Sequence, residues 1–92
     1  MSQARVWRVE FDADAARELR KLGAAAERAI VRYLRQRIAT AENPRRFGKP
    51  LTGDLKGLWR YRVGDYRMVA AIGDDRFIVL IVTVRHRREV YD

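Results

Sequence analysis

The stretch Trp59-Arg60-Tyr61-Arg62-Val63-Gly64-Asp65-Tyr66-Arg67 alternates bulky apolar residues with arginines on both sides of a Gly-Asp pair. Period-two alternation around a glycine-containing turn is typical of a β-hairpin. With Gly64-Asp65 as a two-residue type II′ loop, Arg62 faces Arg67 across the hairpin, and Arg60 shares their face. The other face, which we assign to the core, carries Trp59, Tyr61, Val63, Tyr66 and Met68.

The arginine face of this hairpin indicates an anion site. Like charges that lie opposite each other on a sheet are destabilising, so the fold gains nothing from placing Arg62 beside Arg67. A bound anion would remove that repulsion, and a polyanion is the simplest candidate. The alternative is that these arginines only solvate the outer face of the hairpin.

The composition indicates one small domain over residues 1–92 with an acidic partner. The formal net charge of +8 favours nucleic acid or an acidic protein as that partner. The chain has no cysteine, which excludes a disulfide framework. Its N-terminus lacks the apolar segment of a signal peptide, and the longest apolar run, Phe77 to Val84, is too short to span a membrane. We therefore expect a cytoplasmic protein with no membrane partner.

Hydrophobic periodicity predicts the element order β-α-α-β-β-β. Residues 5–11 alternate as a half-buried strand does, and a short helix follows that Asp12 or Asp14 can cap and that ends at Gly23. A second helix is predicted over about 24–41, with Ile30, Leu34 and Ile38 as its apolar stripe. The apolar run 77–84 is typical of a central strand covered on both faces. These elements predict an α+β fold, a mostly antiparallel four-stranded sheet with an N-terminal helical hairpin packed on one face.

Two further groups of cations flank the hairpin in sequence. Residues 43–57 are predicted to form a loop, and basic loops beside a basic sheet face often contact phosphates. A soluble connector is an equally good interpretation of this loop. The second group follows the central strand, together with the only histidine. These two groups contain Arg45, Arg46, Lys49 and Lys56 in the loop, and Arg85, His86, Arg87 and Arg88 near the C-terminus.

The available side chains argue against several kinds of catalytic site. One histidine without any cysteine argues against zinc, and no Gly-rich phosphate loop occurs. The only serine, Ser2, lies at the end of the chain, and no carboxylate pair lies among the arginines to hold a metal. We therefore expect neither a metal nor a cofactor.

Metal-free phosphate chemistry on RNA is compatible with these residues. RNA carries its own nucleophile, the 2′-OH, so an enzyme needs to align it, stabilise charge on the phosphorus centre and move protons. Arginines bind phosphate oxygens bidentately and stay charged, which suits them to the stabilising role. Tyr91 and His86 are the titrating side chains near the arginines that can serve as base or acid. The alternatives are that His86 is a polar cap on the end of the strand and that Tyr91 is a packing residue that anchors the tail with Val90.

The chain resembles the RelE family of toxins, within the RelE/ParE superfamily of bacterial and archaeal toxin–antitoxin systems. The resemblance covers nearly the whole chain, and its last two motifs together are specific. The motifs are Phe11-Asp12 leading into Ala16, Leu19, Lys21 and Leu22; Pro50-Leu51-Thr52-Gly53 ahead of the hairpin stretch 59–67; and His86-Arg87-Arg88-Glu89-Val90-Tyr91.

The resemblance implies a small sheet with two N-terminal helices and an enzyme that cuts mRNA in the ribosomal A site. In that family the 2′-OH attacks the adjacent phosphate, leaving a 2′,3′-cyclic or 3′-phosphate and a 5′-OH. An antitoxin protein that wraps the toxin neutralises it. The matching residues are Arg60 and Arg62 as the basic pair, Arg67 as the phosphate-stabilising arginine, Arg87 as the arginine serving the leaving group, and Tyr91 as the C-terminal tyrosine that stacks on or activates the substrate.

Three positions depart from the family pattern. Some relatives have lysines at the positions of Arg60 and Arg62, where a lysine can act as the base. Arginine does not release its proton under ordinary conditions, so Tyr91 and His86 are the candidates for that role here. Arg85 stands where many relatives have glycine. The cations that we assign to RNA or ribosome binding are Arg45, Arg46, Lys49, Lys56, Arg85 and Arg88.

Two other functions use the same fold. A ParE-like toxin would bind and poison DNA gyrase without cutting RNA, since fold alone does not decide function. A module that binds only its antitoxin would act as part of a DNA-binding autorepressor. The chain has no helix-turn-helix of its own, so contact with operator DNA would come through the antitoxin.

Overall fold

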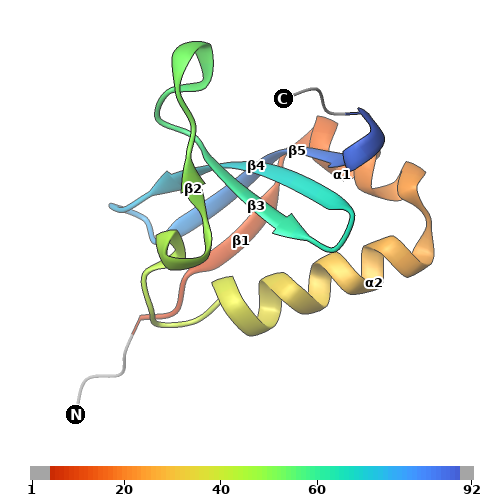
Figure 1. Cartoon of the computed structure of the whole chain (residues 1–92). Coiled ribbons are helices and arrows are strands. Elements are labelled where there is room, and N and C mark those ends of the chain that lie inside the picture. The colour runs from red at the N-terminus through yellow and green to blue at the C-terminus, as the bar shows by residue number, and fades with distance from the viewer. Residues whose placement is uncertain (1–4, 90–92) are drawn as a thin grey trace.

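A computed structural model describes residues 5–89 of the chain (Figure 1). Within these residues the chain forms two α-helices and one sheet of five strands. The helices are α1 (Ala13–Leu22) and α2 (Ala24–Tyr33), and the strands are β1 (Arg8–Phe11), β2 (Lys49–Pro50), β3 (Trp59–Val63), β4 (Tyr66–Gly73) and β5 (Ile78–His86). Both helices cover the same face of the sheet, which confirms the predicted α+β class.

The strand order in the sheet is β1-β5-β4-β3-β2. β1 runs parallel to β5, and the other neighbouring strands are antiparallel. The apolar run that the sequence assigns to a central strand is β5, which lies between the first and the fourth strand. The N-terminal strand therefore joins the fold by pairing with the last strand of the chain.

The sheet has one strand more than the sequence predicts. The segment predicted as a loop over 43–57 contains β2, in which Lys49 pairs with Arg60 and Pro50 with Trp59. A proline is tolerated there because β2 is an edge strand and needs no second hydrogen-bonding neighbour. Two residues are too few for an alternating pattern to appear, which is why the sequence gives no sign of this strand.

The two helices are joined directly at Gly23, as predicted. Asp12 caps α1, because its carboxylate accepts a hydrogen bond from the Ala15 N–H at 2.8 Å. Gly23 has a φ of +96°, a conformation that lets the chain leave α1 and enter α2 without a linker. α2 gives way to a single π-helical turn over Leu34–Ile38, so the predicted second helix ends earlier than residue 41. Neither α-helix in the described part of the chain has the length and apolar character that a bilayer crossing requires.

The core lies between the helices and the sheet. The predicted helical stripe of Ile30, Leu34 and Ile38 is buried, and it packs with Tyr61 and Met68 from the hairpin. The hydroxyl of Tyr61 donates a hydrogen bond of 2.8 Å to the Pro44 carbonyl, and burial raises the pKa of this phenol to about 12. This bond ties the segment after α2 to strand β3.

A β-bulge in β5 changes which side chains face the helices. Val69 pairs with Thr83, but the next residue of β4, Ala70, pairs with Ile81. Val82 is therefore an extra residue, and such a residue reverses the in–out alternation beyond it. As a result Val84 is buried in the core with Ile81, and Arg85 comes to the face that the helices do not cover.

Candidate functional site

The hairpin of β3 and β4 has the predicted register. Val63 pairs with Tyr66, and Arg62 pairs with Arg67. Gly64 has a φ of +57°, whereas Asp65 is not among the described residues with positive φ, as a type II′ turn requires. The turn therefore fixes the two arginines as direct neighbours on adjacent strands.

The third strand extends this pair into a row. Arg67 pairs on its other side with Arg85 of β5, so Arg62, Arg67 and Arg85 lie side by side across β3, β4 and β5. We call these three residues the arginine row. Neighbouring strands are about 5 Å apart, so the backbones of the three arginines lie within about 10 Å of one another along the sheet. Such a row repels itself, and it suits a ligand with several negative charges.

Two more cations extend the row toward the edge of the sheet. Arg60 lies two residues before Arg62 and so shares its face, and Lys49 of β2 pairs with Arg60. The Nε atom of Arg60 is buried without a hydrogen-bond partner among the described residues. Leaving a donor buried in this way costs about 1–3 kcal/mol, which a residue serving only to solvate the sheet has no reason to incur. The five residues of the basic face are Lys49, Arg60, Arg62, Arg67 and Arg85.

Glu18 of α1 holds one end of the arginine row. Its Oε2 lies 3.0 Å from Nε of Arg85, and its Oε1 accepts a hydrogen bond of 3.0 Å from the Val84 N–H. β1 ends opposite Ile81, so the Val84 N–H belongs to a stretch of β5 that β1 does not pair. One carboxylate thus completes the strand edge and orients the arginine next to it. No local sequence pattern identifies Glu18 as part of the site, because its contact with Val84 spans more than sixty residues.

The structure does not bring His86 to the arginine row. His86 pairs with Tyr66, and their rings pack edge to face with centroids 5.5 Å apart, on the side of the sheet opposite to the row. Its Nδ1 accepts a hydrogen bond of 3.1 Å from the Arg88 N–H. The bulge at Val82 causes this placement, because it shifts the alternation of β5 by one residue. His86 therefore does not share the face of the arginine row, and its role in proton transfer stays a prediction.

Arg87 lies at the turn end of the hairpin. Its N–H donates a hydrogen bond of 2.7 Å to the Asp65 carbonyl, and its Nη1 lies 3.6 Å from the Asp65 carboxylate. Both side chains are largely exposed, so this ion pair is weak and a phosphate can compete with it. Arg88 is exposed in the same 3-10 turn. Tyr91, the predicted C-terminal tyrosine of the site, lies outside the described residues.

Two predicted RNA-binding arginines have structural contacts instead. Arg45 forms two hydrogen bonds to the Asp74 carboxylate, at 3.0 and 2.6 Å, which raise the pKa of Arg45 and lower that of Asp74. Its guanidinium also lies 5.6 Å from the ring centroid of Trp59. Arg46 forms an ion pair with Glu42 and lies 4.5 Å from the ring centroid of Phe47.

These contacts hold the 43–57 segment against the rest of the chain. For its two arginines they favour the interpretation of the segment as a connector over that of a phosphate-binding loop. The lysines of the same segment differ from each other. Lys49 belongs to the basic face, and Lys56 is exposed beyond it in the loop between β2 and β3. The structure thus divides the predicted cations of this segment between two roles.

Comparison with known proteins agrees with the fold. A family model described as the ParE toxin of the type II toxin–antitoxin system parDE matches residues 9–91. A Mycobacterium tuberculosis protein named Toxin RelE is 38% identical over 91 residues, which are 99% of this chain and 92% of that protein. Toxin RelG of the same organism is 35% identical over 83 residues, 90% of this chain and 93% of that protein.

Solved structures of toxin–antitoxin complexes contain similar chains. One chain of the RelBE2 complex from Mycobacterium tuberculosis superposes with a TM-score of 0.82 at 32% identity, covering 95% of this chain and 98% of that chain. A chain of the archaeal RelE–RelB complex from Pyrococcus horikoshii superposes with a TM-score of 0.66 at 23% identity, covering 91% and 98%. The second likeness concerns the fold alone.

Proposed function

Because the chain belongs to the ParE toxin family of type II toxin–antitoxin systems, within the RelE/ParE superfamily, we propose that it is a ribosome-dependent mRNA endoribonuclease. The observation that carries this proposal is the arginine row across β3, β4 and β5. A toxin that acts only by binding a protein target has no need to hold three like charges side by side. An enzyme that stabilises an RNA phosphate during cleavage needs such a cluster.

The proposed reaction uses the nucleophile of the RNA itself. The 2′-oxygen attacks the adjacent phosphorus and loses its proton to a base, while the bond from phosphorus to the 5′-oxygen breaks. The products are a 2′,3′-cyclic phosphate and a 5′-OH, whose oxygen takes up a proton. Negative charge builds on the non-bridging phosphate oxygens in between, and arginines stabilise it without any proton transfer of their own.

Each arginine has a role in this proposal. Arg67, at the centre of the row, binds the reacting phosphate, and Arg62 and Arg85 bind it or its neighbours from the two sides. Arg60 contacts a flanking phosphate. Arg87, beside the hairpin turn, serves the leaving 5′-oxygen after exchanging Asp65 for the substrate.

Proton transfer is proposed for Tyr91. The other candidate, His86, packs against Tyr66 on the opposite side of the sheet. A tyrosine has a reference pKa of about 10, and neighbouring guanidinium groups favour its anion. Tyr91 follows Arg87 closely in sequence, and the resemblance to the RelE family is what supports this role for it.

A cognate antitoxin is part of the proposal. Chains similar to this one occur in complexes with antitoxins, and an acidic partner suits a chain of net charge +8. We propose that the antitoxin suppresses the activity by covering or disturbing the basic face. Any contact with operator DNA would then come from the antitoxin.

A second function is favoured by one specific observation, the match to a model of ParE toxins. In that case the chain would bind and poison DNA gyrase, and the basic face would be a docking surface. Arrested cells would then show DNA damage while their mRNA remained intact.

The deciding experiment measures mRNA cleavage on programmed ribosomes. Three proteins are compared, namely the unmodified chain, Arg67→Ala and Arg45→Ala, each with ribosome-bound mRNA and with free mRNA. We expect cuts only on the ribosome, their loss in Arg67→Ala and their retention in Arg45→Ala. An absence of cuts with all three folded proteins would favour the gyrase-binding function.

A further inference from the structure

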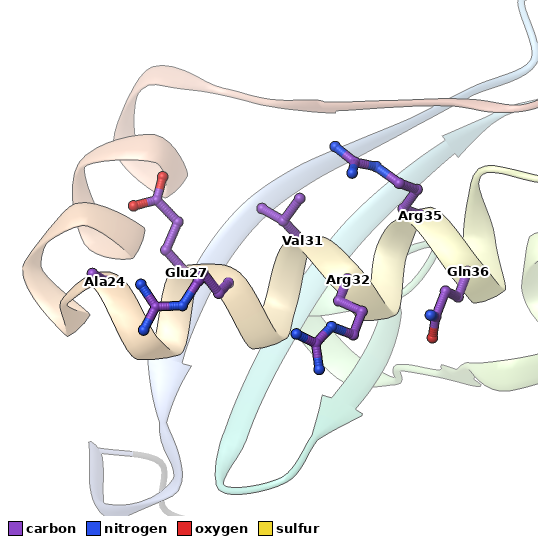
Figure 2. A pocket seen from close by; sticks show the side chains of 7 residues that line it. Ala24, Glu27, Val31, Arg32, Arg35 and Gln36 are labelled. Carbon is purple, nitrogen blue, oxygen red and sulfur yellow. The ribbon is translucent and has the colours of Figure 1, made fainter.

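Arginines outside the basic face differ in how the chain holds them. On the outer surface of α2, Arg28, Arg32 and Arg35 line an open hollow, and Figure 2 shows the Arg32 and Arg35 side chains extending to opposite sides of the helix. These side chains do not converge on one point, so they do not form a common site. Arg87 differs from them, because its own N–H and the N–H of the next residue are both hydrogen-bonded to other parts of the fold.

The end of β5 rests on the turn of the β3–β4 hairpin. His86, the last residue of β5, pairs with Tyr66, the first residue of β4. One residue later, the Arg87 N–H donates a hydrogen bond of 2.7 Å to the Asp65 carbonyl, which belongs to the hairpin turn itself. The 3-10 turn Arg87–Glu89 therefore begins in contact with the same turn that sets the hairpin register.

His86 caps this 3-10 turn through its imidazole. The first N–H groups of a helical turn have no partner within the turn, and the side chain just before it usually supplies one. Here Nδ1 of His86 accepts a hydrogen bond of 3.1 Å from the Arg88 N–H. With the Asp65 carbonyl bound to the Arg87 N–H, the first two donors of the turn are both satisfied. An Nδ1 that accepts carries no proton, so the capping imidazole is the neutral form with its proton on Nε2.

The contact with Tyr66 holds the His86 ring in this orientation. The two rings pack edge to face, with centroids 5.5 Å apart and an interplanar angle of 85°. Tyr66 follows the Gly64-Asp65 turn directly, so the ring contact and the backbone bond reach the same corner of the hairpin. His86 is half-buried, whereas the side chain of Arg87 is largely exposed. The imidazole is thus packed against the fold, while the arginine beside it remains accessible to a ligand.

We propose that His86 is a positioning residue, which holds the start of the 3-10 turn and through it places Arg87 beside the hairpin turn. The inference rests on the proposed function for what Arg87 does there, namely serve the leaving 5′-oxygen of the RNA. His86 itself lies on the other side of the sheet from the arginine row. Positioning needs only a hydrogen-bond acceptor at residue 86, whereas proton transfer needs a group that titrates.

The chain contains a second example of the same cap with a different side chain. Asn43 precedes the 3-10 helix Pro44–Phe47, and its Oδ1 accepts a hydrogen bond of 3.0 Å from the Arg45 N–H, two residues further on. The bond from Arg88 to His86 has the same spacing. Asparagine offers this acceptor without an imidazole and without a group that titrates. His86→Asn therefore keeps the cap, removes the ring and removes any acid–base function.

Two matched substitutions separate the hydrogen bond from the ring. His86→Asn keeps the acceptor and loses the ring contact with Tyr66, whereas His86→Phe keeps an aromatic ring against Tyr66 and loses the acceptor. Both leave the net charge unchanged, with histidine counted as neutral, so the general attraction of the chain for RNA stays the same. Ribosome-dependent mRNA cleavage is measured in single-turnover reactions over a range of ribosome concentrations, with melting curves to show that each protein is folded.

We expect His86→Phe to lower the maximal cleavage rate by about 10- to 100-fold with little change in the half-saturating concentration, because a displaced Arg87 no longer meets the leaving oxygen. His86→Asn should keep most of the rate that His86→Phe loses. Equal losses in both variants would overturn the proposal and favour proton transfer by the imidazole. Full activity of His86→Phe would also overturn it, because the hydrogen bond would then be dispensable.

A double substitution tests whether His86 acts through Arg87. In the Arg87→Ala background, His86→Phe should cause no further loss of rate, because the residue that His86 positions is already missing. The same fold-loss in both backgrounds would contradict the proposal. General damage to the fold predicts that equal loss, so the comparison separates positioning from stability.

Hydrogen exchange of the Arg88 amide gives a readout that needs neither RNA nor ribosomes. We expect this amide to exchange faster in His86→Phe than in the unmodified chain and to stay protected in His86→Asn, as NMR would measure. Unchanged exchange in His86→Phe would overturn the cap. If the unmodified chain cuts no mRNA while the Arg88 amide responds as expected, the proposed function fails and His86 remains the residue that positions Arg87.

Discussion

The arginine row and the arginines of the 43–57 segment have the same chemistry in different surroundings. In the row, the neighbour of Arg67 on each adjacent strand is another arginine. In the segment, Arg45 and Arg46 each contact a carboxylate and an aromatic ring. The first arrangement brings like charges together and suits an anionic ligand, whereas the second ties the segment to the rest of the chain.

This difference shows that the number of cations in a stretch says little about its role. Residues 43–57 contain a dense group of positive charges, yet the structure uses both arginines to fasten the segment. The row gathers its charges from three strands and shows only a pair of them in any one stretch of sequence. Whether a cation is available to a ligand depends on its spatial neighbours, and the following experiments test that distinction.

The largest expected effect separates the two groups directly. Arg67→Ala should lower the rate of ribosome-dependent mRNA cleavage by about 100- to 1,000-fold, because it removes a donor aimed at charge that develops during the reaction. Arg45→Ala should leave that rate within a few-fold of the unmodified chain. The rates are measured in single-turnover reactions, with circular dichroism melts to show that both proteins are folded. Comparable cleavage rates for Arg67→Ala and Arg45→Ala would contradict the distinction between the arginine row and the arginines of the 43–57 segment.

The next effect concerns how the 43–57 segment is anchored. Tyr61→Phe removes the hydrogen bond to the Pro44 carbonyl and leaves that buried acceptor without its partner. We expect the free energy of unfolding to fall by about 1–2 kcal/mol, as urea titration would measure it. Cleavage should persist under conditions where the variant is folded. A loss of cleavage in the folded variant would mean that the segment contributes to the site after all.

A smaller effect is expected at the end of the row. Glu18→Ala removes both the acceptor for the Val84 N–H and the partner of Arg85, and should cost about 1 kcal/mol of stability. Glu18→Gln keeps an oxygen for the N–H and should recover most of that loss, as thermal melts of the two variants would show. Equal melting temperatures for the two variants would contradict the role assigned to the backbone bond.

The smallest effect is the pH dependence of the Arg45–Asp74 pair. The hydrogen bonds from Arg45 hold the pKa of Asp74 below its ordinary value. The Asp74 carboxylate therefore binds a proton less readily in the folded state than in the unfolded chain. The stabilisation is therefore present above about pH 4, the ordinary aspartate range, and is lost as pH falls through the lowered pKa.

Asp74→Asn should remove this dependence. Thermal melts of the unmodified chain and of Asp74→Asn are compared between pH 6 and pH 3. The difference between their melting temperatures should become smaller as the pH falls. The difference should be small throughout, because Asp74 is largely exposed to solvent. A difference that grows on acidification would reverse the sign that we assign to the pair.

The sequence predicts the fold well where the pattern is local. Alternation on both sides of Gly64-Asp65 fixes the hairpin register, and the structure has the same pairs. Helical spacing identifies the buried stripe of α2, and Asp12 and Gly23 mark the ends of α1. The two-residue strand β2 and the π-helical turn escape prediction, because each is shorter than the period that would identify it.

The site could be predicted only in part for a related reason. Arg62 and Arg67 follow from the hairpin, but the position of Arg85 depends on the bulge at Val82. That bulge lies inside an apolar run in which Val, Leu and Ile fit either face of a central strand, so no residue type marks it. The same shift sends His86 to the other side of the sheet, and Glu18 reaches the site from a helix far away in sequence.

The position of β5 in the sheet has a consequence for the folding of the chain during its synthesis. β5, which lies between β1 and β4 in the sheet, is the last strand to be synthesised among residues 5–89, and β1 has no other strand to pair with there. A nascent chain that stops before residue 78 therefore has neither a closed core nor the third member of the arginine row. Long-range pairing of this kind folds slowly, and it forms only after most of the chain has been made. If the chain cuts mRNA as proposed, we therefore expect a product of interrupted translation to be inactive.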